Sequence, residues 1–247
     1  LVSRTGYTDA EATATLTITP VEVTVTADDR SMTYGDTMTL TPAEGVTYAG
    51  FVNSETSSVV SGTGSITYTY KDGATTVTVD NTLEAGSYAI VPGVGGLSAT
   101  NYTFAPANGT LTVGKATMEV ESDGYDELYD GNSHGLTASV DGMPGMTITY
   151  SDSATGTFTS TSPEYTDAGT YTVYFKAVDP DGNYADATGS ADIVIRKVEV
   201  TVTADDRSMT YGDTTTLTPA EGVTYAGFVN SETSSVVSGT GSITYTY

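Results

Sequence analysis

Apolar and polar residues alternate strictly in several short stretches of this chain. Clear examples are residues 21–26, 65–70 and 171–177. A period of two, built from β-branched and aromatic residues, is typical of a strand with one buried face. Long helical periodicity is absent from the sequence, and only residues 54–60 suggest a turn or two of helix, with Asn53 as the N-cap. The pattern predicts an all-β protein.

The alternating segments belong to a long internal repeat. Residues 21–70 return at residues 198–247 with a single substitution, Met38 in the first copy becoming Thr215 in the second. We call these segments the first repeat and the second repeat. Repetition on this scale predicts tandem domains, and it favours a scaffold or stalk over an enzyme.

The repeat also sets the expected domain boundaries. Residues 7–20 resemble residues 184–197, which run directly into the second repeat. No Gly/Ser-rich or Pro-rich spacer separates the segments, so we expect domains stacked end to end within a longer polypeptide. Four parts are predicted: the C-terminal strand of a preceding Ig-like domain (1–20), a first β domain (21–115), an Ig-like β-sandwich (116–197) and the N-terminal part of a second copy of the first β domain (198–247).

Two segments share a pattern of acid, Ala, Gly, small residue, Tyr, any residue and aliphatic residue, namely residues 84–90 and 167–173. In Greek-key sandwiches, a tyrosine near the start of the penultimate strand bonds back to the upstream backbone. The pattern predicts structural tyrosine corners at Tyr88 and Tyr171. The final strands are predicted at residues 110–113 and 192–195.

Composition excludes several classes of partner. The chain has eight Lys and Arg residues against 31 Asp and Glu, which gives a net charge of −23. Binding to nucleic acid or to an anionic membrane depends on basic residues, so we expect neither. Cysteine is absent, and no apolar run approaches the roughly 18 residues of a membrane helix. We therefore expect no disulfide, no thiol chemistry and no membrane insertion in this segment.

The candidate chemistry is sparse. His134 is the only histidine and lies among turn residues, so we predict no catalytic residue, no cofactor-binding residue and no enzyme. Asp179, Asp181 and Asn183 alternate around Gly182 as oxygen ligands do in calcium loops, but position 190 lacks the expected acidic residue. We therefore favour an Asx-rich turn without metal, and keep calcium as the weaker alternative.

The longer motifs resemble known families. Residues 23–36 with their Tyr-Gly-Asp sequence, together with segments 49–62, 85–90, 101–104 and 108–116, resemble the MBG repeat (mostly beta, glycine-rich) of bacterial surface adhesins. Residues 128–140 and 165–177 resemble the bacterial Ig-like domains that accompany it. The resemblance implies the stalk of an adhesin on the bacterial surface or outside the cell. It leaves the MBG-type domain open between an Ig-like sandwich and a β-grasp-like sheet.

A structural stalk or spacer is therefore the leading hypothesis. Its expected partners are neighbouring repeats, further copies in a fibre, and a host or cell-surface ligand that the sequence does not identify. One alternative is a self-assembling filament in which residues 1–20 of one chain complete a neighbour by strand donation. The other is a carbohydrate-binding module that uses exposed tyrosines such as Tyr174.

Overall fold

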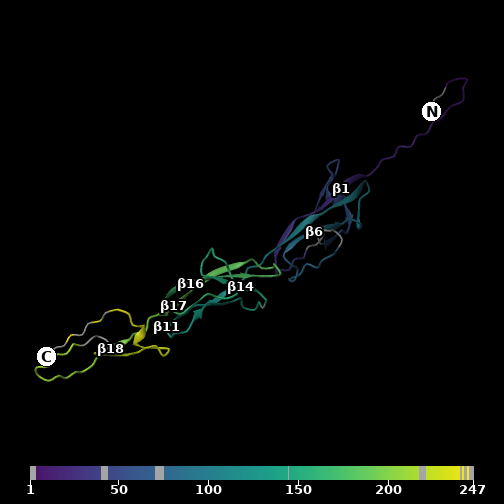
Figure 1. Ribbon diagram of the computed structural model, residues 1–247. Helices are drawn as coiled ribbons and strands as arrows, with labels where there is room; N and C mark the ends of the chain where they lie inside the picture. Colours follow the sequence, from purple (N-terminus) through teal and green to yellow (C-terminus); the bar gives the residue numbers. More distant parts are fainter. Residues whose placement is uncertain are drawn as a thin grey trace. The chain divides into compact units, whose positions relative to one another are not determined.

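The computed structural model describes residues 4–39, 44–69, 75–143, 145–216, 221–239, 241 and 244, and it is all-β (Figure 1). The chain divides into two compact units, Leu1–Ala116 and Thr117–Tyr247. Each unit is described by itself below.

The first unit contains two β-sheets and a short ribbon. The four-stranded sheet has the order β2 (Arg30–Thr33), β9 (Gly109–Gly114), β6 (Gly86–Gly93) and β5 (Ser65–Thr69). The three-stranded sheet has the order β3 (Val46–Ala49), β1 (Val21–Ala27) and β8 (Tyr102–Ala107), and β4 (Ser61–Gly62) pairs with β7 (Leu97–Ser98). The pairs β1–β8 and β2–β9 are parallel, whereas the other pairs are antiparallel.

The core of the first unit lies between these two sheets. From Val23 onward every second residue of β1 is buried, as its alternation predicts, while Val21 is exposed; β6 and β9 bury their own alternate residues. Strand β1 contacts β6 and β9 across the interior. The buried residues of these strands are Val23, Val25, Ala27, Tyr88, Ile90, Leu111 and Val113. The first unit is therefore a β-sandwich.

The predicted helix near residues 54–60 is only a single 3-10 turn, η1 (Ser57–Val59). Its N-cap is Thr56, whose side chain accepts from Ser58 N, and not Asn53 as the sequence suggested. Asn53 instead has a left-handed φ of 57° in the turn before it. No residue of η1 is buried, so no helix packs on a sheet here as a β-grasp-like fold would require. Within the described residues, no helix is long and apolar enough to cross a membrane.

The strand that carries Tyr88 is not penultimate in its domain. Strand β9 covers the predicted final strand at residues 110–113, but β8 and the short β7 intervene between β6 and β9. The order differs because the chain leaves β6 and crosses to the other sheet, where β8 pairs in parallel with β1. A pattern of local residues does not show this crossover.

The second unit contains the predicted Ig-like domain, which has a four-stranded sheet and two ribbons. The sheet order is β11 (Tyr125–Leu128), β17 (Ala187–Arg196), β16 (Gly169–Val178) and β14 (Thr147–Ser151). The ribbons pair β10 (Glu121–Asp123) with β13 (Thr137–Ser139), and β12 (His134–Gly135) with β15 (Glu164–Tyr165). The core cluster draws on both parts of the sandwich and contains Leu136, Ala138, Val173, Phe175, Ile193 and Ile195.

The second repeat forms the remaining part of this unit, with β18 (Thr201–Ala204), β19 (Val223–Ala226) and η2 (Ser234–Val236). Its two strands pair in the register of β1 and β3, since Thr201 faces Ala226 as Thr24 faces Ala49. Val202 is nevertheless 55% exposed, while Val25 at the same repeat position is 1% exposed. Strand β1 has β8 and β6 against it as well as β3, whereas among the described residues β18 is paired with β19 alone.

The predicted strand within residues 1–20 does not form in the described part of that segment, residues 4–20. Leu16 and Ile18 are 85% and 82% exposed, although their counterparts Ile193 and Ile195 are buried in β17. The reason is the lack of neighbours. Strand β17 is held between β16 and β11, and the described residues contain a single set of such strands. A strand without a hydrogen-bonded neighbour is not stable in water.

The two predicted tyrosine corners differ in burial. Tyr88 is 4% exposed, and its hydroxyl donates to the carbonyl oxygen of Glu84 at 2.8 Å. Tyr171 is half-buried and donates to the carbonyl oxygen of Asp167 at 3.2 Å, with its ring stacked on Tyr165 at a centroid distance of 4.0 Å. Both hydroxyls thus bond to the backbone four residues upstream.

We expect Tyr88→Phe to lower the free energy of unfolding of the first unit by about 1 to 3 kcal/mol, because it leaves a part-buried carbonyl without its donor. Tyr171→Phe is expected to have a smaller effect on the second unit, since water can replace a hydroxyl that is less buried. Denaturant unfolding of the whole chain measures both. Tyr7→Phe, at an exposed ring, is the control. An equal or larger loss for Tyr171→Phe would contradict the explanation by burial.

Candidate functional site

The predicted calcium residues form a turn organised by one carboxylate. Asp179 is 7% exposed, and its Oδ2 accepts from the backbone N–H groups of Asn183 at 2.6 Å and Tyr184 at 2.9 Å. Its Oδ1 accepts from the N–H of Asp181 at 3.0 Å. Burial pushes the pKa of Asp179 upward, but the N–H groups of Tyr184, Asp181, Asn183 and Gly182 outweigh it, so the pKa lies below its usual value.

This arrangement favours the Asx-turn interpretation over a cation site. Both carboxylate oxygens of Asp179 are already used as acceptors for the backbone. Asp181 contributes its backbone N–H to the turn, and its side chain is exposed. Among the described residues, no group of three or more histidine, aspartate and glutamate side chains is placed to hold a metal ion.

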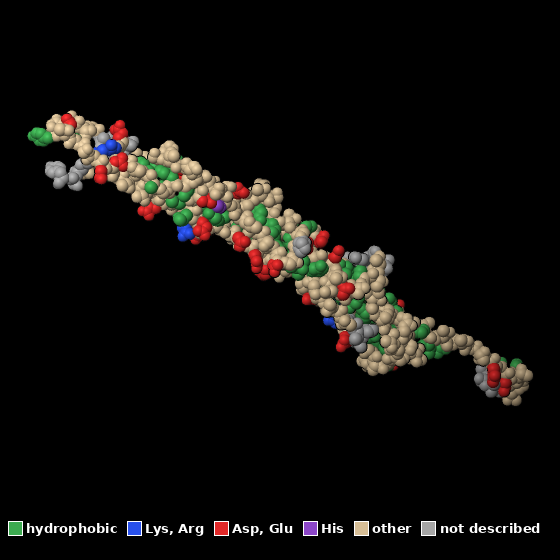
Figure 2. Space-filling view, turned by 90° about the horizontal axis from the view of Figure 1, so that it is seen from below, with side chains coloured by type: hydrophobic (Ala, Val, Ile, Leu, Met, Phe, Trp, Pro, Cys, Tyr) green, Lys and Arg blue, Asp and Glu red, His purple; other side chains and the backbone are tan. Residues whose placement is uncertain are grey.

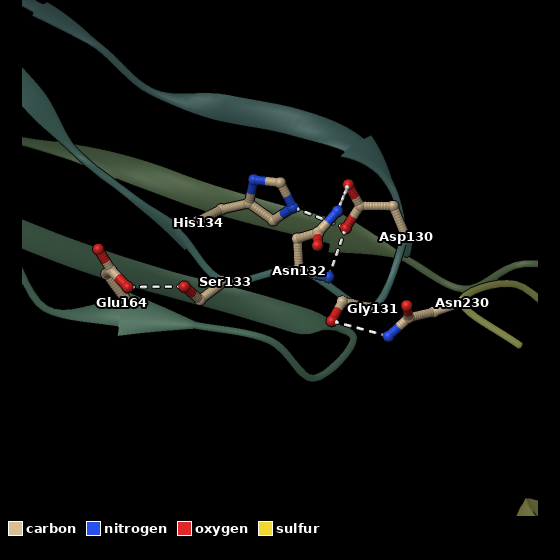
Figure 3. Close-up of polar contacts among 7 residues, drawn as sticks. All are labelled: Asp130, Gly131, Asn132, Ser133, His134, Glu164 and Asn230. Carbon is tan, nitrogen blue, oxygen red and sulfur yellow. Dashed lines mark hydrogen bonds and ion pairs between the residues drawn. The ribbon is translucent and has the colours of Figure 1, made fainter. Parts of the chain in front are cut away.

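A second turn, residues 129–134, follows β11 and contains the only histidine (Figure 3). Asp130 accepts from the backbone N–H and the side-chain amide of Asn132, both at 2.9 Å, and its Oδ1 lies 2.9 Å from His134 Nε2. The amide of Asn132, followed by His134, holds the pKa of Asp130 well below its usual range. The His134 ring also stacks on Tyr125, with centroids 3.8 Å apart. These contacts fix the shape of the turn.

The serine and the histidine of this turn have different partners. Ser133 Oγ donates to Glu164 at 2.6 Å, whereas the Nε2 atom of His134 is engaged with Asp130 (Figure 3). In a catalytic triad the serine hydroxyl is bonded to the histidine that activates it. The described contacts of Ser133 and His134 do not form that pair.

The exposed side of the turn contacts the second repeat through Gly131 and Asn230. The side-chain amide of Asn230 donates to the carbonyl oxygen of Gly131 at 3.3 Å (Figure 3). Gly131 has a left-handed φ of 78°, and a Cβ placed on it would lie 2.5 Å from the Cβ of Asn230. Glycine is favoured at this position, because a side chain would be strained and, opposite Asn230, would also collide with the asparagine side chain.

Tyr129 makes a second contact between the Ig-like domain and the second repeat. Its hydroxyl donates to Glu232 Oε1 at 2.7 Å. The hydrogen bond to Glu232 is the largest of the effects that raise the pKa of Tyr129, and it adds to partial burial and to the negative charges of Glu232, Asp167 and Asp130. The hydroxyl must keep its proton to donate. The contact is therefore present below the ordinary tyrosine pKa of 10.0 and is lost as the pH rises through the raised value.

Both contacts reach one segment of the second repeat, which we call the second joint loop (residues 227–237). The loop turns through Asn230 and Ser231, whose φ values of 50° and 60° are both left-handed. A shallow hollow separates it from the Ig-like domain and is lined on the two sides by Tyr129, Asp167, Ala168, Lys197, Val198, Val200, Gly227, Phe228, Val229, Glu232, Val236 and Val237. The site is thus a docking contact between two domains.

Reasoning from the sequence did not identify this site. It noted the turn around His134 but assigned no role to Tyr129 or Gly131, and it treated residues 54–60 only as a helix candidate. One available signal was Asn53, an asparagine before Ser54 where the chain turns sharply, because asparagine is enriched at left-handed positions. The counterpart of Asn53 in the second repeat, Asn230, contacts Gly131, which lies 99 residues away along the chain. The sequence pattern carries no information on that pairing.

We expect Asp179→Asn to lower the melting temperature of the second unit at neutral pH, because one amide oxygen replaces two carboxylate oxygens that accept three N–H groups. The folded pKa of Asp179 lies below its ordinary value of 3.8, so this stabilisation is present above pH 3.8 and is lost as the pH falls through the folded pKa. The difference from the original chain should shrink in acid, as measured by circular dichroism.

Asp181→Asn is the matched control, since the exposed side chain of Asp181 is replaced while its backbone N–H is kept. A melting temperature that rises with calcium, and that loses this rise in Asp179→Asn, would contradict the Asx-turn interpretation and establish a metal site.

Comparisons with known proteins show similarity at two levels. Among solved structures, the chain is similar to N-cadherin EC1-3 of Drosophila, with 13% identity, a TM-score of 0.22 and coverage of 72% of this chain and 64% of that one. It is also similar to Dpr2 Ig1-Ig2 in complex with DIP-Theta Ig1-Ig3, with 12% identity, a TM-score of 0.24 and coverage of 72% and 67%. The chain thus spans less than two thirds of the N-cadherin chain. No curated protein matches it.

The family match is more specific. Residues 23–112 and 200–247 match the family described as MBG domain (YGX type), which covers more than half of the chain. The two matched segments start 177 residues apart, as the two repeats do. The resemblance that the Tyr-Gly-Asp motif suggested is confirmed, and the chain belongs to the MBG domain (YGX type) family.

Proposed function

We propose that this chain is part of the structural stalk of an extracellular bacterial adhesin or cell-surface fibre, and that it has no catalytic role. In this proposal the MBG-type and Ig-like domains alternate as spacers, and a ligand is bound elsewhere on the polypeptide. The observation that carries it is the docking contact between the Ig-like domain and the repeat that follows it. A spacer must hold consecutive domains, and this contact is a means of doing so.

The short connection between the two domains supports the proposal. Strand β17 ends at Arg196 and β18 begins at Thr201, so only residues 197–200 lie outside the strands. A link this short leaves few conformations to be lost when the domains dock. Two hydrogen bonds, Tyr129 to Glu232 and Asn230 to Gly131, then fix the contact on one side of the link. We infer that the joint resists bending.

Surface charge agrees with an extracellular spacer. Acidic side chains are spread over the face shown in Figure 2, and basic side chains are few. A single sign of charge keeps neighbouring molecules apart and preserves solubility. The scarcity of Lys and Arg also leaves few cleavage points for proteases of trypsin-like specificity. Both properties suit a protein that is exposed outside the cell.

Strand donation between chains remains a second candidate, and one observation favours it. Leu16 and Ile18 are exposed in a segment whose counterpart, β17, buries the equivalent residues. A donated strand would bury both side chains in a neighbour. If donation operates, sedimentation of the purified chain should show assembly that depends on concentration and that Leu16→Asp abolishes. The stalk hypothesis predicts monomers in the same experiment.

The joint predicts a specific cross-link. We expect the double variant Gly131→Cys with Asn230→Cys to form a disulfide when it is oxidised by oxidised glutathione, which accepts the two hydrogens. The two Cβ positions lie 2.5 Å apart, and a disulfide needs about 3.5 to 4.5 Å, so a shift of roughly 1 Å suffices. Intact mass before and after alkylation measures the yield. The chain has no other cysteine to interfere.

A second glycine of the same unit supplies the matched control. Gly182 also has a left-handed φ, of 80°, and a Cβ placed on it has no atom within 4 Å beyond its chain neighbours. We expect no disulfide within the molecule for Gly182→Cys with Asn230→Cys. A comparable yield for both pairs would mean that the cysteines meet by random collision, and the proposed joint would have to be abandoned.

A further inference from the structure

The first repeat has a loop of the same shape, residues 50–60, which we call the first joint loop. Asn53 and Ser54 have φ values of 57° and 61°, close to those of Asn230 and Ser231. The N-cap residues Thr56 and Thr233 also agree, with φ of −136° in both. The second joint loop contacts the Ig-like domain. The first joint loop belongs to the first unit, in which no Ig-like domain is described. The shape is therefore independent of docking.

Contacts within the first unit hold the first joint loop in this shape. The hydroxyl of Tyr102 on β8 accepts from the N–H of Val52 at 3.2 Å and donates to Glu55 Oε2. Phe51 packs edge-on against the Tyr102 ring at a centroid distance of 5.2 Å. A preformed loop loses little conformational entropy when it binds. The loop therefore has the rigidity that a docking surface requires.

Glu55 keeps acceptor capacity for docking while it is bonded to Tyr102. Tyr102 donates to Glu55, and Tyr129 donates to Glu232, the equivalent carboxylate of the second repeat. An ionised carboxylate has two equivalent oxygens with about four acceptor positions, so one glutamate can accept from a tyrosine of its own domain and from a tyrosine of the preceding domain at the same time. Such a carboxylate links the interior of the domain to the joint.

In the first joint loop, the counterparts of the residues through which the second joint loop docks are exposed. Val52 is 43% exposed, while its counterpart Val229 is half-buried and lines the hollow against the Ig-like domain. Asn53 is exposed as well. Residues 7–20, which lead into the first repeat, resemble residues 184–197, the last strand of the Ig-like domain that leads into the second repeat. The same type of neighbour therefore precedes both loops in the sequence.

We propose that the first joint loop is a docking surface for an Ig-like domain of the type formed by residues 117–197. This inference rests on the proposed spacer function and names the partner of the surface. The partner must offer a tyrosine hydroxyl at the position of Tyr129, which Glu55 accepts. It must also offer a glycine at the position of Gly131, because a Cβ there would collide with Asn53 as it would with Asn230. A side chain in place of that glycine is accommodated only when the facing asparagine is replaced as well, as in the paired cysteine variants below.

The test uses the chain with a copy of residues 117–197 in place of residues 1–20, joined directly to Val21 as Lys197 joins Val198. One variant carries Gly131→Cys with Asn230→Cys in the original domains. A second carries Gly131→Cys in the added domain with Asn53→Cys. A third pairs Gly131→Cys of the added domain with Asn230→Cys. Each is oxidised by oxidised glutathione and read by intact mass.

We expect the first and second variants to form the disulfide in similar yield and the third to form none. If the first pair closes and the second does not, the docking role of the first joint loop is wrong while the spacer joint stands. If neither closes, both proposals fail. Closure of the third pair to the same extent would also overturn the inference, because it would show contact without specificity.

A measurement without cysteines guards against variants that do not fold. The methyl resonances of Val52 should shift when the added domain is present, because that side chain becomes half-buried, whereas those of Val229 should not move. Glu55→Gln should weaken the shift of Val52, and Glu232→Gln should leave it unchanged. Identical Val52 resonances with and without the added domain would overturn the proposal.

Discussion

The first unit and the Ig-like domain each contain a parallel pairing between a strand from the beginning of the domain and a strand from its end. Strand β1 pairs with β8 and β2 with β9 in the first unit, and β11 pairs with β17 in the Ig-like domain. Strand edges expose backbone groups that need partners, so these pairs close the sandwich. Among the described residues, neither residues 4–20, which form no strand, nor β18, which exposes Val202, has such a parallel partner.

Much of the all-β fold could be predicted from the sequence, because alternation is a local property that reports which face of a strand is buried. Residues 21–26 and 171–177 lie in β1 and β16, where the predicted apolar face is buried from Val23 and Val173 onward. Residues 65–69 also form a strand, β5, but its buried residue is Thr69 on the face predicted to be polar, and Tyr70 lies outside the described residues. The sequence did not predict which strands pair with one another. Strand β8 was not expected between β6 and β9, and its place is set by the parallel pairing with β1. The spacing of apolar residues does not indicate which strands pair when they lie about eighty residues apart along the chain, as β1 and β8 do.

The docking contact was beyond prediction for a related reason. Asp179 could be interpreted as a turn residue, since all its partners lie within five positions along the chain. Tyr129 and Glu232, by contrast, are about a hundred positions apart, and the residues of the joint loop are identical in both repeats. Identical sequences in different surroundings carry no signal about those surroundings. The structure shows that the two joint loops have the same shape, and that only the second contacts the Ig-like domain.

The identity of the two loops also determines where specificity must lie. A loop sequence that is present in both repeats cannot by itself choose a partner, so the choice falls to the domain it contacts. In the Ig-like domain two features perform this role: the hydroxyl of Tyr129 and the missing side chain at Gly131. The turn that presents them is held by Asp130, Asn132 and His134. His134, for which the sequence predicted no catalytic role, thus helps to hold the turn that presents Tyr129 and Gly131.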